Sequence, residues 1–156
     1  MKNTTHLILG MLALTFGMEV KAQIQLPSVF SDGMVLQQNS KVAVWGWGNP
    51  SETLMILSEW NPGDTVRTVV DNQGRWKAEV PTGRAGGPYT LEVKGGNDSR
   101  KLSDVMLGEV WLCSGQSNME WSANMGIMNG EQEVKQAASP SVRIFPYPKK
   151  GADTPQ

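Results

Sequence analysis

The sequence is poor in the two residues that most often build metal sites and cross-links. It contains a single cysteine, Cys113, and a single histidine, His6. One cysteine cannot close a disulfide within the chain, which excludes the disulfide-stabilised class of small exported domains. We therefore expect Cys113 to be a small buried residue on a strand.

Charge is sparse and evenly balanced. The chain has 14 Lys and Arg against 15 Asp and Glu, a net charge of −1, with no basic block and no stripe of Lys and Arg. Proteins that bind nucleic acid usually carry a concentrated basic surface. The composition therefore predicts no nucleic-acid partner.

The N-terminus has the pattern of a secretory signal peptide. Lys2 precedes an apolar run of twelve residues, Leu7–Met18, and Val20 and Ala22 are small residues at the positions that a signal peptidase selects. The run is too short to span a membrane. We predict a signal peptide over 1–22, cleavage after Ala22, and export to the periplasm or the cell exterior without a stable membrane anchor. His6 lies in this segment, so residues 23–156 contain no histidine.

Residues 23–103 have the alternation of a β domain. Apolar residues recur at every second position in 76–80 and 89–93, Val66, Thr68 and Val70 alternate in the same way in 66–70, and two further strands are predicted over 41–48 and 53–59. Residues 71–74, 86–88 and 95–98 are rich in Gly, Pro, Asn and Asp, which favours turns. This pattern predicts an antiparallel β-sandwich.

The pattern changes over 104–156. Val110–Cys113 has no polar alternation, as in a strand covered on both faces of a parallel sheet. Residues 130–138 favour a helix with Asn129 as its cap, and 142–145 favour a second buried strand. We therefore predict that the chain begins a β-α-β unit here, the start of an α/β domain.

Ser117 follows the first of these strands and admits two interpretations. As a nucleophile it would lie at a strand-to-helix turn, with Gly115 allowing close backbone approach and Gln116 and Asn118 supplying amides for an oxyanion or a sugar hydroxyl. As a cap it would pair with Glu120 in a capping box, and spacing alone favours the cap. The motif lacks the second glycine of the G-x-S-x-G elbow, which argues against the α/β-hydrolases proper.

The stretch GEVWLCSGQSNMEW (108–121) closely resembles the start of the catalytic domain of sialate O-acetylesterases, members of the SGNH (GDSL-like) hydrolases. The segments 26–50 and 141–150 resemble the β-domain opening and the second catalytic-domain strand of the same enzymes. The resemblance implies a flavodoxin-like α/β domain over 104–156, Ser117 as nucleophile and oxyanion-hole N–H donor, and no metal or organic cofactor. The implied substrate is O-acetylated sialic acid or another acetylated glycan.

The catalytic His and Asp of that family are absent from this chain. Lys135 could replace the base in principle, as in Ser-Lys hydrolases, but we expect it on a solvated helix face. Without a base, Ser117 should attack esters slowly, since general-base help contributes roughly 10²–10⁴ in rate. We therefore expect the chain to be an N-terminal portion of an esterase with little activity alone.

Two alternatives remain open at this stage. The β-sandwich could be a carbohydrate-binding or scaffold module, because aromatic rings stack on sugar faces. The chain could also be a non-functional remnant. The module hypothesis depends on tryptophans that strands of a small sandwich more often bury: Trp45, Trp47, Trp60 and Trp76.

Overall fold

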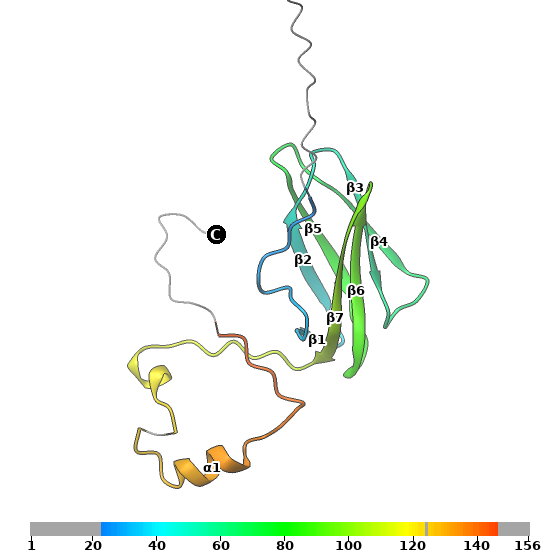
Figure 1. Ribbon diagram of the computed structural model, residues 1–156. Coiled ribbons are helices and arrows are strands. Elements are labelled where there is room, and N and C mark those ends of the chain that lie inside the picture. Colours follow the sequence, from blue (N-terminus) through cyan, green and yellow to red (C-terminus); the bar gives the residue numbers. More distant parts are fainter. Residues whose placement is uncertain (1–22, 124, 147–156) are drawn as a thin grey trace, which may run out of the picture.

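The structure, a computed structural model, describes residues 23–123 and 125–146 and is predominantly β (Figure 1). The predicted signal peptide, with its cleavage position after Ala22, lies outside the described residues. Within them, a run of strands precedes one short 3₁₀-helix, η1, and one α-helix, α1. Their bounds are β1 (Val35–Gln37), β2 (Lys41–Trp47), β3 (Thr53–Ser58), β4 (Thr65–Val69), β5 (Arg75–Pro81), β6 (Gly86–Gly95), β7 (Asp98–Gly108), η1 (Ser117–Glu120) and α1 (Gly130–Gln136).

The strands form two sheets. Five strands make a curled sheet in the order β1-β7-β6-β3-β4, and β2 pairs with β5 in a second, two-stranded sheet. The β2–β5 ladder is antiparallel and runs from Lys41 opposite Pro81 to Trp47 opposite Arg75. The larger sheet is mixed, because β1 runs parallel to β7. The prediction of a wholly antiparallel fold is therefore wrong at this edge. The chain passes through all the other strands before β7 returns to pair with β1, so the two are not joined by a hairpin.

One hydrophobic core lies between the two sheets. The predicted alternation in β5 is confirmed, since Trp76, Ala78 and Val80 are buried while the residues between them are exposed. Leu54, Ile56, Leu91, Val93, Val105 and Leu107 face them from the larger sheet.

The predicted turn at 71–74 connects the two sheets. Asp71 Oδ1 accepts hydrogen bonds from the backbone N–H groups of Arg75 and Gln73, each at 2.8 Å. The bond from Arg75 has the largest effect on the pKa of Asp71 and lowers it, with the Gln73 bond and the Arg75 charge acting in the same direction and desolvation opposing them. Gly74 has φ of 75°, a left-handed conformation that glycine adopts without strain.

The predicted β-α-β unit does not form among the described residues. Only its helix is present, as α1, while residues 110–113 and 142–145 have no regular secondary structure. Trp111 and Leu112 are 83% and 94% exposed. A strand with apolar residues on both faces needs neighbours on both edges and both faces, and no described segment pairs with either of these. The last strand of the larger sheet, β7, continues past residues 103 and 104 to Gly108.

Candidate active site

A pair of glutamines fixes the start of the segment that carries Ser117. Gln37 Nε2 and Gln38 Nε2 donate to the two carboxylate oxygens of Glu109 at 3.1 and 2.8 Å, and Gln37 Oε1 accepts the N–H of Val110 at 2.9 Å. The hydrogen bond from Gln37, followed by that from Gln38, lowers the pKa of Glu109. The chain therefore leaves β7 in a direction set by the end of β1. We call residues 109–146 the Ser117 segment.

Ser117 is the first residue of η1 and is exposed to solvent. The N-cap is Gln116, and its side chain makes no capping hydrogen bond. The capping-box interpretation, with Ser117 as the cap, is therefore wrong in this structure. The turn is held instead by the backbone, where the N–H of Met119 donates to the carbonyl of Gln116 at 2.9 Å. Within the described residues the Ser117 hydroxyl has no hydrogen-bond partner.

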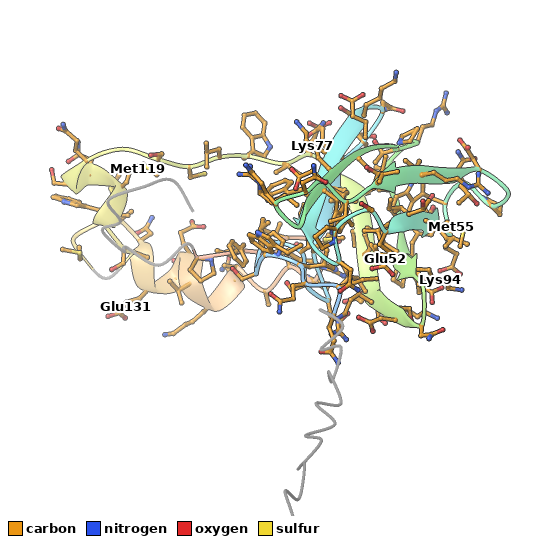
Figure 2. All side chains as sticks on the ribbon, turned by 90° about the horizontal axis from the view of Figure 1, so that it is seen from above. Glu52, Met55, Lys77, Lys94, Met119 and Glu131 are labelled. Atoms are coloured by element: carbon orange, nitrogen blue, oxygen red, sulfur yellow. The ribbon has the colours of Figure 1, made fainter. Side chains whose placement is uncertain are left out.

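The other predicted site residues lie beside Ser117 in the same exposed stretch. Gly115 has a steric role, because a Cβ there would lie 2.5 Å from Cγ of Met119. Gln116 and Asn118 are both exposed, so their amides are accessible to a ligand. Figure 2 shows this turn, marked by Met119, standing away from the sheets, as does Figure 1.

No catalytic base contacts Ser117 in the part of the chain that the structure describes. Lys135 lies in the last turn of α1 and is exposed, as predicted. Cys113 is a free, exposed cysteine, so the prediction that it is buried on a strand is wrong, because the strand itself does not form. Across residues 23–123 and 125–146 no group of His, Cys, Asp and Glu side chains is arranged to hold a metal ion.

An open hollow of about 470 Å³ lies beside the first turn of α1. Ser117 is not among its lining residues, which are Ala123, Gly126, Ile127 and Asn129–Gln132. The hollow is therefore separate from the candidate nucleophile.

None of the helices in the described residues is both long enough and apolar enough to cross a membrane.

Sequence reasoning did not identify the contacts of Arg143. Its guanidinium reaches the carbonyl oxygens of Gly33 and Asp104 and the carboxylate of Asp104. The local pattern around Arg143 indicated only a buried strand, and nothing in that pattern marks a partner about 110 residues earlier. The one feature of the sequence that could have indicated this contact is the charged Arg143 between the apolar residues Val142 and Ile144.

The chain is similar in sequence and in structure to carbohydrate esterases. It is 32% identical over 127 residues to the sialate O-acetylesterase of Mus musculus and 33% identical over 129 residues to that of Homo sapiens, in each case over 76% of this chain. A solved structure of a carbohydrate acetylesterase from Xanthomonas citri matches 75% of the chain with a TM-score of 0.67 and 36% identity. No protein-family model matches.

The matched region is only a part of each relative's own length. The chain spans 23% and 24% of the length of the mouse and human enzymes, and 26% of the Xanthomonas citri chain.

Proposed function

From its homology to the N-terminal region of sialate O-acetylesterase and to a carbohydrate acetylesterase, we propose that this chain supplies the nucleophile of an exported carbohydrate O-acetylesterase. The observation that carries the proposal is this homology, at about one-third identity over three quarters of the chain. The exposed Ser117, with a hydroxyl that no described residue engages, is consistent with it. Residues 1–22 would direct export.

The proposed reaction is acyl transfer through Ser117. The Ser117 oxygen attacks the acetyl carbonyl, and the resulting oxyanion accepts a hydrogen bond from the backbone N–H of Ser117 and from Gln116 or Asn118. The sugar hydroxyl leaves with a proton, and water then attacks the acetyl-serine to release acetate and restore Ser117. The base that takes the proton of Ser117, and later that of water, must come from outside the described residues.

The proposed substrates are O-acetylated sialic acid or another O-acetylated glycan. A hybrid protein tests this, in which the matched region of the Xanthomonas citri acetylesterase is replaced by the corresponding residues of this chain. We expect the hybrid to release acetate from an acetylated sugar. The ratio of rates on O-acetylated sialic acid and acetylated xylan then identifies the preferred sugar. A folded hybrid that releases no acetate from either, or from an aryl acetate, would argue against the proposal.

A second function, glycan binding by the β-sheet unit, is favoured by the exposure of two tryptophans. Trp76 is buried and Trp60 donates its indole N–H to the Pro81 carbonyl at 2.9 Å, so these two have structural roles. Trp45 and Trp47, two residues apart on the outer face of β2, are each 41% exposed.

The surroundings of this tryptophan pair suit an acidic sugar. Phe30 packs edge-on against Trp45, with ring centroids 4.7 Å apart, which fixes the indole. Lys77 lies opposite Trp45 and Arg75 opposite Trp47 in the β2–β5 register, and both are exposed. Figure 2 shows Lys77 projecting from this sheet. Indole rings stack on the apolar face of a sugar, while the two cations attract a carboxylate.

Replacing both Trp45 and Trp47 with alanine is therefore expected to weaken sialic acid binding about tenfold or more, since two stacking surfaces are lost. Titration calorimetry measures the affinity. The matched control is Trp111→Ala, which removes an equally large exposed indole from the Ser117 segment and should leave the affinity unchanged. Equal affinities in the double variant and the unmodified protein would eliminate this surface as a glycan site.

A further inference from the structure

We propose that Arg143 docks the Ser117 segment onto the β-sheet unit, and that Gly33 and Asp104 form a site built to receive its guanidinium. The docking itself does not depend on the proposed esterase function. Its consequence for Ser117 does, because a nucleophile acts only when the segment that carries it is held in place.

Arg143 makes contacts at both ends of its guanidinium fork. Nη1 donates to the carbonyl oxygen of Gly33 at 2.8 Å and also to that of Asp104. Nη2 donates to Oδ1 of Asp104 at 2.9 Å, which is at the same time an ion pair. Three oxygens from two separate segments therefore converge on one side chain, and every one of them is an acceptor that a guanidinium satisfies.

The exposure pattern around Arg143 is the reverse of the usual one. Val142 and Ile144 are 66% and 86% exposed, whereas the Arg143 side chain is 25% exposed. The charged residue, not its apolar neighbours, faces the β-sheet unit. Since charged side chains are seldom covered unless they are paired, this burial indicates a specific contact at Arg143.

The receiving site is held in shape by the sheet unit itself. Asp32 Oδ1 accepts the N–H of Ser103 at 2.7 Å, and the N–H of Gly33 donates to the Ser103 carbonyl at 3.0 Å. Gly33 and Asp104 have φ of 78° and 56°, conformations that turn their carbonyl groups out of the ordinary strand direction. These contacts do not involve Arg143, and they hold the backbone at Gly33 and directly before Asp104. The sheet unit itself therefore positions the two carbonyl acceptors of the site.

This contact closes the Ser117 segment into a loop. One end is fixed at Glu109 by Gln37 and Gln38, and the other at Arg143, which meets Asp104 across 39 positions of sequence. Figure 1 shows the chain after α1, in orange to red, turning back to the trace that leaves β7. Ser117 and α1 lie between the two fixed points.

The geometry favours arginine over lysine at position 143. A guanidinium presents donors in a rigid planar fork and can satisfy acceptors on two segments at once, whereas an ammonium is a single point charge on a flexible stem. A lysine at this position would keep the charge attraction to Asp104 but lose simultaneous contact with Gly33. We therefore expect the Arg143→Lys variant to retain only part of the docking.

Backbone ¹⁵N relaxation of the full chain tests the docking. In the unmodified protein we expect order parameters of about 0.8 for residues 139–145, and values below about 0.6 in Arg143→Gln, which loses every charge-assisted contact. Arg143→Lys and Asp104→Asn should give intermediate values, because each retains some of the contacts. The control is Arg84→Gln, which removes an exposed arginine with no contact to the segment and should change nothing.

Order parameters of β6 and β7 measured in the same experiment show whether each variant remains folded. If Arg143→Gln disturbs these strands, Asp104→Asn decides the question, since asparagine also tolerates a positive φ. The proposal is overturned if residues 139–145 are already mobile in the unmodified protein, or if they remain as ordered in Arg143→Gln or Asp104→Asn. An inactive Ser117 would leave all these measurements unchanged, so the docking and the proposed function fail separately.

Discussion

Replacing Ser117 with alanine is expected to lower acetate release by the hybrid esterase by about 10³-fold or more. Alanine removes the oxygen that the proposed mechanism acetylates, so the covalent route through Ser117 is lost and only uncatalysed attack by water remains. The change should appear in kcat, because the exposed hydroxyl makes no contact that the fold needs. Initial rates on an aryl acetate measure it.

The matched control is Ser114→Ala, an exposed serine three positions before Ser117, in the residues without regular secondary structure that lead into η1. It should retain nearly full activity. A Ser117→Ala hybrid with an undiminished rate would refute the nucleophile assignment. Equal losses of activity in both variants would mean that this stretch tolerates no substitution, and the loss in Ser117→Ala would then not identify Ser117 as the nucleophile.

Replacing Leu91 with alanine is expected to destabilise the β-sheet unit by about 2–5 kcal/mol, the range for a fully buried leucine. Leu91 lies on β6, in the middle of the five-stranded sheet, with no exposed surface. It is paired with Leu102 on β7 and with Ser58 on β3, so its side chain is enclosed by packed neighbours on both sides. Because small domains are marginally stable, this loss is a large fraction of the total free energy of unfolding. Urea unfolding followed by tryptophan fluorescence measures it.

Leu112→Ala is the matched control, since the same atoms are removed from a side chain that is 94% exposed. Its expected effect is within about 0.5 kcal/mol. A large loss of stability in Leu112→Ala would show that residues 110–113 are packed in solution, contrary to the structure. A small loss in Leu91→Ala would contradict the position of the core.

The strands of the β-sheet unit were predictable because each has one face in the core. Alternation in β5 places Trp76, Ala78 and Val80 inward, and the same rule applies to β3 and β6. The parallel pairing of β1 with β7 was not predictable from local pattern. Three residues, Val35–Gln37, carry too few alternations to define a strand, and their partners are about 70 positions away.

In the Ser117 segment, by contrast, the predicted strands do not form. The apolar run Val110–Cys113 predicted a covered strand, but burial depends on neighbours that local sequence does not contain, and the described chain supplies none. Helix α1 was predicted because its helix-forming residues act locally. The contacts of Arg143 were not predicted, because its acceptors at Gly33 and Asp104 are distant in the sequence and only the folded chain brings them together.

The position of the acetyl group on the enzyme tests the role of Ser117 most directly. The hybrid esterase is mixed with an aryl acetate, quenched in acid within the first turnover and digested, and its peptides are weighed by mass spectrometry. We expect one acetyl group on the oxygen of Ser117, absent from Ser117→Ala and present in Ser114→Ala. An acetyl group found on another residue of an active hybrid would show that Ser117 is not the nucleophile.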